Sequence, residues 1–353
     1  MRADHIPNDP GFTNLWGFRN TGQYGGQVGF DMDVDTAWDT TRGVSSVSVL
    51  ILDTGTDGNH PDLNEAARMD FTSTALNGCD NHGVAVAGCV SAIIDNNLGT
   101  VGVAPNCPVL SARIFVSFTS LPCSGAGTVI ASQYVNALQW GMTQGARISN
   151  ASLSLVSSSA ISAQYNTTRT NGMVHFASAG NDGLSGSNYP GSLNSVHEVA
   201  ALHPGGQLAN FSNFSNDVIC APGEFIYTTD RVGAVGYNGT NYVVQAGTSF
   251  ASPYTAGIAA LMRSISPLLT PDDVESILRS TATDLGATGR DNTFGWGMAN
   301  AQRAVAEALL RAQCAFLGGY CHQSTVGYAS GGGAFAICST TPLTCPGTAT
   351  LKL

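Results

Sequence analysis

Short apolar segments rich in β-branched residues recur along the chain, and they constrain its fold more than any other feature. The five segments are Ser46–Leu52, Val109–Phe115, Met173–Ser178, Val196–Leu202 and Val218–Ala221. Polar turns bound each of them, which is typical of strands buried inside a parallel sheet. Helical patterns lie between or after them: apolar residues recur every four positions from Thr128 to Gly145, and Thr270–Asp273 has the composition of a helix start. This alternation predicts an α/β fold with a central, mostly parallel sheet covered by helices on both faces.

Composition limits the classes of function. The chain has 353 residues, of which 43% are hydrophobic, enough for one large α/β domain. Its formal net charge is −10 and its single lysine is Lys352, so we expect no nucleic-acid partner. No apolar run reaches the length of a membrane-spanning helix, so we expect no membrane span. The first residues lack the character of a signal peptide, so an exported protein would have its signal and pro-segment outside this sequence.

Cysteine usage indicates an oxidising compartment and a separate C-terminal segment. The nine cysteines are Cys79, Cys89, Cys107, Cys123, Cys220, Cys314, Cys321, Cys338 and Cys345. No two of them form a CxxC pair, so we expect several disulfides and, given the odd number, at least one unpaired thiol. The last four are crowded around a glycine-rich stretch too small to form its own core. We therefore divide the chain into an N-terminal arm (1–45), a main domain (46–311) and a cysteine-rich C-terminal extension (312–353).

Four polar residues stand at the ends of predicted strands or at the starts of predicted helices. Asp53 ends an apolar strand, His82 and Ser249 precede small apolar helical stretches, and Asn181 follows another strand. Taken singly, each has a simpler interpretation as a turn, capping or structural residue. Taken together, Asp, His and Ser in this chain order form one of the known nucleophilic triads, in which the carboxylate orients the base that activates the serine. The Asn181 side-chain amide can then donate to a developing oxyanion.

These segments resemble the subtilisin-like serine peptidases, the subtilases, over roughly residues 7 to 308. The matching motifs are Asp53-Thr54-Gly55, His82-Gly83, Gly247-Thr248-Ser249 and Ala179-Gly180-Asn181. The segments Asn8–Pro10 and Asn20–Gln23 are similar to the thermitase-like branch of that family. The resemblance implies a three-layer subtilisin-like fold and a secreted serine endopeptidase. It further implies that Asp53, His82 and Ser249 form the triad, that Asn181 is the oxyanion donor, and that catalysis proceeds through an acyl-enzyme. The related sedolisins lack this histidine and asparagine.

The resemblance also implies a substrate cleft. Family members bind peptides as an added strand, and the matching wall here is Ser152-Leu153-Ser154, with Ala179-Gly180 opposite and Asn188 at the base of the first pocket. Small residues and an uncharged amide favour apolar or aromatic P1 side chains, and the sequence shows no cluster of acids near the pocket that would favour basic ones. Asn188 has the alternative interpretation of a turn-capping residue.

A calcium site is the third implication. The residues that match the family's ligands are the side chains of Asp9, Asp62 and Asn96 and the carbonyl groups of Ile94, Leu98 and Thr100. Calcium takes six to eight oxygen ligands of these kinds. We expect the ion to be structural and to fix the N-terminal arm. The alternative is that the asparagine-rich loop is only a turn.

Other functions remain open at this point. The wall has Ser154 and Leu155 where relatives usually have glycines, so a processing peptidase of narrow specificity is one alternative. A peptide ligase or macrocyclase on the same fold is another, and a non-catalytic binding module is a third, although none of the four catalytic positions is lost. We expect a monomer whose partners are protein or peptide substrates and its own pro-segment, acting as a folding inhibitor.

Overall fold

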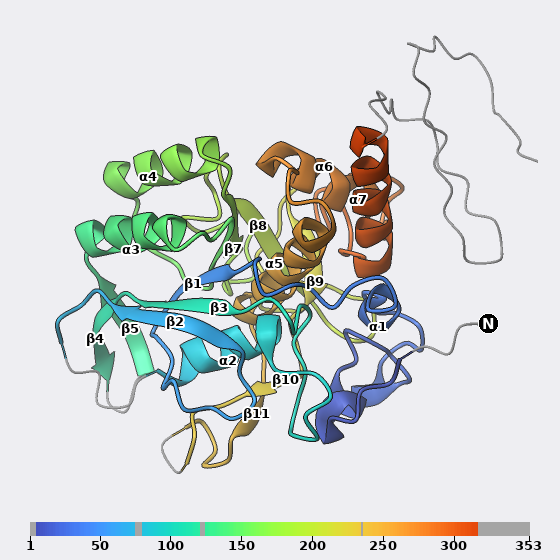
Figure 1. The fold of residues 1–353 in the computed structure, drawn as a ribbon, viewed down its shortest axis with the longest axis horizontal. Helices are drawn as coiled ribbons and strands as arrows, with labels where there is room; N and C mark the ends of the chain where they lie inside the picture. The colour runs from blue at the N-terminus through green and yellow to red at the C-terminus, as the bar shows by residue number, and fades with distance from the viewer. Residues whose placement is uncertain (1–4, 75–79, 121–123, 234–235, 317–353) are drawn as a thin grey trace, which may run out of the picture.

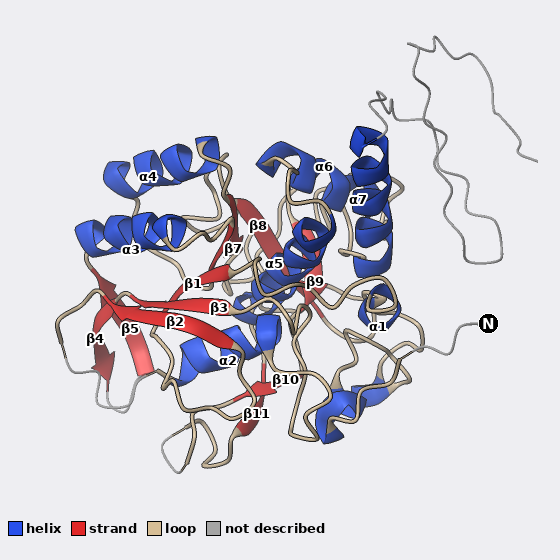
Figure 2. Cartoon of the chain, in the orientation of Figure 1, coloured by secondary structure: helices blue, strands red, loops and turns tan. Residues whose placement is uncertain are grey.

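A computed structural model describes residues 5–74, 80–120, 124–233 and 236–316 of the chain. Figure 1 shows the course of the chain and Figure 2 its secondary structure. The strands are β1 (Val49–Asp53), β2 (Glu65–Asp70), β3 (Val109–Arg113), β4 (Phe115–Ser120), β5 (Ser124–Val129), β6 (Ile148–Ala151), β7 (Val174–Ser178), β8 (His197–Leu202), β9 (Ile219–Pro222), β10 (Ile226–Thr229) and β11 (Tyr242–Gln245). The α-helices are α1 (Val34–Ala37), α2 (Asn81–Ser91), α3 (Ala131–Thr143), α4 (Ser159–Thr170), α5 (Thr248–Ile265), α6 (Pro271–Thr281) and α7 (Ala301–Phe316).

Seven strands form one parallel sheet in the order β2-β3-β1-β6-β7-β8-β9. Alternate residues of a strand point to opposite faces, and β1 illustrates the consequence. Val49 and Ile51 pack with α2 and α5 in one core, whereas Leu50 and Leu52 pack with α3 and α4 in another. Helices therefore cover both faces of the sheet (Figure 2), and the predicted α/β fold is confirmed.

Two strands of this sheet have no clear signal in the sequence. β2 is an edge strand whose side chains are mostly exposed, so it lacks an apolar run. β6 has only four residues, and two of them, Ser149 and Asn150, are buried polar residues. Pattern reading depends on apolar periodicity, so it misses strands of both kinds. The two hairpins β4–β5 and β10–β11 lie outside the main sheet and are antiparallel.

The helix signals agree better with the structure. Thr270 is the N-cap of α6, and it forms a reciprocal capping box with Asp273. Helix α3 ends close to Gly145 as predicted but begins at Ala131 rather than Thr128, because Thr128 belongs to β5.

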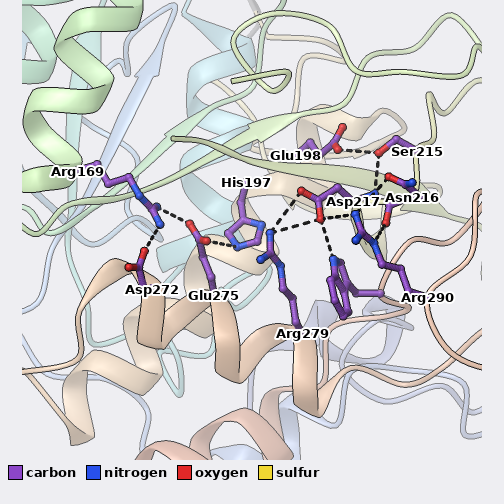
Figure 3. Close-up of polar contacts among 11 residues, drawn as sticks. Arg169, His197, Glu198, Ser215, Asn216, Asp217, Asp272, Glu275, Arg279 and Arg290 are labelled. Atoms are coloured by element: carbon purple, nitrogen blue, oxygen red, sulfur yellow. Dashed lines mark hydrogen bonds and ion pairs between the residues drawn. The ribbon is translucent and has the colours of Figure 1, made fainter. Parts of the chain in front are cut away.

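Ion pairs attach α6 to the rest of the molecule (Figure 3). Arg169, near the end of α4, bonds Asp272 and Glu275 of α6. Glu275 Oε2 also lies 3.7 Å from Nε2 of His197, the first residue of β8. Burial, helped by the charges of Arg279 and Arg169, lowers the pKa of His197 to about 3, so this imidazole is neutral at physiological pH.

A polar cavity of about 210 Å³ lies beside this network and is lined by His197, Glu275, Arg279 and the 191–196 loop. It sits where β8 begins. The candidate catalytic residues follow the carboxyl ends of parallel strands, so the cavity is at the opposite edge of the sheet.

The N-terminal arm is part of the hydrophobic core. Trp16 and Phe18 are fully buried, and the indole of Trp16 donates to the Glu224 carbonyl oxygen. At the other end, α7 continues to Phe316, past the expected boundary at residue 312. The rest of the predicted cysteine-rich extension lies outside the described residues.

Three cysteines can be assessed: Cys89, Cys107 and Cys220 are buried free thiols. The side chains of the other six lie outside the described residues, and for them disulfide formation stays a prediction.

Candidate active site

The carboxyl ends of β1, β6 and β7 lie side by side because these strands are neighbours in a parallel sheet. Asp53 is the last residue of β1. Asn181 lies three residues after the end of β7. His82 and Ser249 lie in the first turns of α2 and α5. The fold thus brings the four predicted catalytic residues to one edge of the sheet, the usual ligand position in open α/β folds.

Asp53 and His82 are in direct contact. The carboxylate is 1% exposed, and its Oδ1 accepts hydrogen bonds from His82 Nδ1 at 2.8 Å and from the Thr54 backbone N–H at 2.7 Å. Donation from Nδ1 fixes the tautomer in which Nε2 is free to accept a proton. The imidazole side chain is 27% exposed, so the ring is open to solvent or substrate.

Two small residues allow this contact. The Gly83 N–H donates to Thr54 Oγ1 at 2.9 Å, which joins the start of α2 to the turn after β1. A Cβ atom at Gly83 would lie 2.1 Å from the Gly55 carbonyl oxygen, so a side chain there would push α2 away. The sequence motifs contain both Thr54 and Gly83, and the structure gives each of them this role.

The pKa of His82 determines the expected pH dependence. Burial lowers this pKa, but the charge of Asp53 and its hydrogen bond raise it more, and the net effect is a pKa above the usual value of about 6.5. A base must be neutral to accept the serine proton, so kcat should fall as the pH drops through this raised pKa. A kcat profile on a small peptide substrate measures the midpoint. Full activity near pH 4 would instead indicate the carboxylate chemistry of the sedolisins.

Ser249 lies at the same edge but is not hydrogen-bonded to His82 within the described residues. Its Oγ donates to the Ser152 carbonyl oxygen at 3.4 Å, and Ser152 Oγ donates to the Ser249 carbonyl oxygen at 2.7 Å. Contacts of a catalytic nucleophile are often long in the free enzyme and shorten when substrate binds. Ser249 is therefore hydrogen-bonded to the predicted substrate wall rather than to His82.

Asn181 is exposed, and its amide is oriented by Thr248, a residue to which sequence analysis gave no role. The Thr248 backbone N–H and hydroxyl both donate to Asn181 Oδ1, at 2.9 and 2.8 Å. Because the amide oxygen accepts both of these bonds, the amide nitrogen is the atom left to donate to another group. Thr248 directly precedes Ser249 in α5, so Asn181 is hydrogen-bonded to the immediate neighbour of the predicted nucleophile.

The predicted substrate-binding residues form two walls joined by Asn188. Ser152, Leu153 and Ser154 follow β6, and Ala179 and Gly180 follow β7. The Asn188 N–H donates to the Ala179 carbonyl oxygen at 2.8 Å, and its side-chain amide donates to Ser154 Oγ at 3.2 Å. A Cβ atom at Gly180 would lie 2.4 Å from Asn188 Nδ2, so glycine is needed where the two walls approach.

An acidic residue, Asp182, lies beside Asn188 at the predicted first pocket, where the sequence shows no cluster of acids. Asp182 Oδ2 accepts a hydrogen bond from Asn188 Nδ2 at 2.9 Å and a longer one from Asn213 Nδ2 at 3.4 Å. Sequence reasoning missed this residue because Asp182 directly follows Asn181 and was considered only as part of that motif.

Two buried carboxylates meet at the loop predicted to bind calcium. Asp9 is 3% exposed and Asp62 is fully buried. The Asn96 backbone N–H donates to Asp9 Oδ1 at 3.2 Å, and its side-chain amide donates to Asp62 Oδ1 at 2.7 Å. Burial raises the pKa of both acids, and neither forms an ion pair within the described residues. Two buried, ionised carboxylates without a cation destabilise the folded state, so a bound positive ion would stabilise it at this site.

The remaining donors are also oxygens. The carbonyl oxygens of Ile94, Leu98 and Thr100 accept no hydrogen bond from the described residues. Nowhere in the described ranges do three or more His, Cys, Asp or Glu side chains gather as a metal site. An ion here would therefore depend on amide and carbonyl oxygens as well as on the two carboxylates, which is the ligand chemistry of calcium. The residues present fit that ion.

Comparison with known proteins gives a consistent result. The sequence profile described as the Subtilase family matches residues 45–297. Thermitase from Thermoactinomyces vulgaris is 32% identical over 308 residues, covering 85% of this chain and 99% of that protein. Subtilisin Savinase from Lederbergia lenta is 33% identical over 265 residues, covering 74% and 91% of the two chains.

A solved structure of a protease from Pseudoalteromonas arctica is similar in fold. It aligns with a TM-score of 0.72 at 30% identity, covering 86% of this chain and all of that chain. Within the part of the chain that the structure describes, no helix is long and apolar enough to cross a membrane.

Proposed function

Because the chain belongs to the subtilase family and is a serine endopeptidase, we propose that it cleaves peptide bonds through Asp53, His82, Ser249 and Asn181. Ser249 Oγ attacks the scissile carbonyl carbon while His82 Nε2 takes the hydroxyl proton. The Asn181 amide donates to the resulting oxyanion. His82 then protonates the leaving amine, and the acyl-enzyme is hydrolysed by a water molecule activated in the same way.

One observation carries this proposal: the buried Asp53 carboxylate accepts from His82 Nδ1 at 2.8 Å, beside the helix start that bears Ser249. A buried carboxylate with this contact has a clear chemical role, since it stabilises the imidazolium formed when Ser249 loses its proton. A binding module would have no need of it.

We also propose that the first pocket favours apolar or aromatic P1 residues. The supporting contact joins two uncharged groups, since Asn188 bonds Ser154 at the base, and the nearby Asp182 carboxylate already accepts hydrogen bonds from two amides. A panel of peptides that differ only at P1 tests this preference. Faster cleavage after Lys or Arg than after Phe or Leu would show that Asp182 dominates the pocket.

The acceptor of the acyl group separates the peptidase from a ligase. We propose water, acting outside the cell on protein or peptide substrates, in keeping with the family resemblance. Incubation of a peptide ester with an excess of a peptide amine, followed by mass spectrometry, tests the proposal. The peptidase should give mainly the free acid, whereas predominant amide product would favour ligation or macrocyclisation. Cleavage at a single site across a protein library would favour the narrow-specificity processing peptidase.

Calcium bound by Asp9, Asp62 and Asn96 is part of the proposal, as a structural ion. An ion that binds only the folded state raises the free energy of unfolding by RT ln(1 + [Ca]/Kd), about 2.7 kcal/mol at a hundredfold excess over Kd. Chelation should therefore lower Tm and speed self-digestion. Trp16 and Phe18 hold the arm independently of the ion, so initial kcat should change little.

Scanning calorimetry with chelator, with calcium and with magnesium measures the effect of the ion. Magnesium should restore little stability because it prefers short, near-octahedral contacts. Asp62→Asn should make Tm insensitive to calcium. Equal Tm values of the unmodified protein with chelator and with millimolar calcium would mean that the loop is only a turn.

A further inference from the structure

The backbone carbonyl of Ser249 lacks its normal helical partner. In an α-helix the carbonyl of residue i accepts from the N–H of residue i+4. Four residues after Ser249 in α5 stands Pro253, which is buried inside the helix and has no N–H. A buried acceptor without a donor is costly, so another group must donate to this carbonyl oxygen.

Ser152 is that donor. Its hydroxyl lies 2.7 Å from the Ser249 carbonyl oxygen and comes from the segment after β6, outside the helix. The missing helical bond is thus replaced by a bond to the substrate wall. The residue that carries the nucleophile is therefore held by a side chain from another element.

The direction of the Ser152 hydroxyl is fixed by Asn150. Ser252 Oγ donates to Asn150 Oδ1 at 2.6 Å, and Asn150 Nδ2 donates to Ser152 Oγ at 2.9 Å. Asn150 and Ser252 are fully buried and Ser152 is 4% exposed. Because Ser152 Oγ already accepts from the amide, its single proton is left for the Ser249 carbonyl oxygen.

We propose that Asn150 is a positioning residue for Ser249, acting through the Ser152 hydroxyl. The chain of donors runs from Ser252 to Asn150, then to Ser152, and ends on the backbone of the nucleophile. This inference rests on the proposed function, since it gives Ser249 the role of nucleophile. Sequence analysis did not single out Asn150, because β6 lacks the apolar pattern by which the other buried strands are recognised.

The isosteric variant Asn150→Asp tests the direction of these hydrogen bonds. A carboxylate cannot donate, so the Ser152 hydroxyl should turn toward it and leave the Ser249 carbonyl oxygen unpaired. We expect kcat, and the rate of reaction with a small fluorophosphonate, to fall about tenfold, the effect of losing one buried hydrogen bond. The fluorophosphonate does not use the peptide-binding wall, so its rate reports on the nucleophile alone.

The proposal also predicts that the reaction rate of this variant, relative to that of the parent, depends on pH, which a purely structural role of Asn150 would not cause. The introduced carboxyl is buried, and when it is protonated it can donate to Ser152 again. The ratio of variant to parent fluorophosphonate rates should therefore rise as the pH is lowered from about 9 to about 6. A ratio that stays constant with pH would overturn the donor-chain mechanism.

Asn20→Asp is the matched control. Asn20 is 2% exposed, and its amide donates to the carbonyl oxygens of Phe30 and Pro204, away from the site. This control should lose stability but keep the fluorophosphonate rate of the parent. Unchanged fluorophosphonate rate and kcat in Asn150→Asp would contradict the inference, whereas a change in the KM of peptides alone would assign Asn150 to the substrate wall.

Two further measurements cover the cases in which Asn150→Asp does not fold or the parent protein does not react. If Asn150→Asp does not fold, Ser252→Ala removes only the outer donor and should lower both rates two- to threefold, a fraction of one hydrogen bond. Equal rates in Ser252→Ala and parent would then refute the inference. A parent protein that does not react with the fluorophosphonate at all would contradict the proposed function, a result distinct from either outcome for the variants.

Discussion

Ser249→Ala should lower kcat by about 10⁶-fold, the loss that removal of the nucleophilic serine causes in subtilisin, from which this magnitude is taken. The reason is that alanine has no hydroxyl with which to form the acyl-enzyme. Ser249 is partly exposed, and its Oγ makes one long hydrogen bond, to the Ser152 carbonyl oxygen at 3.4 Å, so alanine should be tolerated.

Single-turnover and steady-state hydrolysis of a small peptide substrate measure this loss, and calorimetry checks that Tm is unchanged. Residual activity within tenfold of the parent, in a preparation free of other peptidases, would remove Ser249 from the role of nucleophile and with it the triad.

Asn181→Leu should lower kcat by about 10²- to 10³-fold with little change in KM, a magnitude that again belongs to subtilisin. Leucine keeps the volume of the side chain but cannot donate to the oxyanion. The amide acts mainly on charge that develops in the transition state, so the effect should fall on kcat. Thr248 loses its acceptor in this variant, since both of its donors bond Asn181 Oδ1.

Asn64→Leu is a suitable comparison for Asn181→Leu. Asn64 is partly buried, and its amide bonds the Pro105 carbonyl oxygen at 2.9 Å, outside the candidate site. This substitution should affect Tm but not kcat. If Asn181→Leu raised KM and left kcat unchanged, Asn181 would only position substrate, and the oxyanion would need another donor.

The sequence was sufficient to predict the layered α/β fold because the strands beside the site are apolar and β-branched. β1 and β7 are fully buried, so their composition reveals them. The polar strand β6 escaped notice because its buried polar residue Asn150 is paired with Ser152, which follows the strand, and with Ser252 of α5. Such pairing depends on three-dimensional neighbours and has no periodic signature.

The candidate site likewise contains residues that the sequence identifies and residues that only the structure identifies. Asp53, His82, Ser249 and Asn181 belong to short motifs, so a resemblance could place them. The supporting residues could not be placed in this way, because their roles depend on distances between elements. Thr248 orients Asn181, and Asp182 reaches Asn188 across a loop. The sequence marks residues 1–45 only as an arm, and the burial of Trp16 and Phe18 in the core depends on neighbours that are distant in the sequence.

Labelling with a fluorophosphonate, followed by mass-spectrometric mapping of the modified peptide, tests the central claim most directly. The reagent phosphonylates a serine that is activated by a neighbouring base, so the account predicts modification at Ser249 alone. Modification should weaken as the pH drops through the raised pKa of His82, and it should be lost in His82→Ala. Absence of labelling in the folded protein, or labelling at another serine, would contradict the assignment of Asp53, His82 and Ser249 as a catalytic triad.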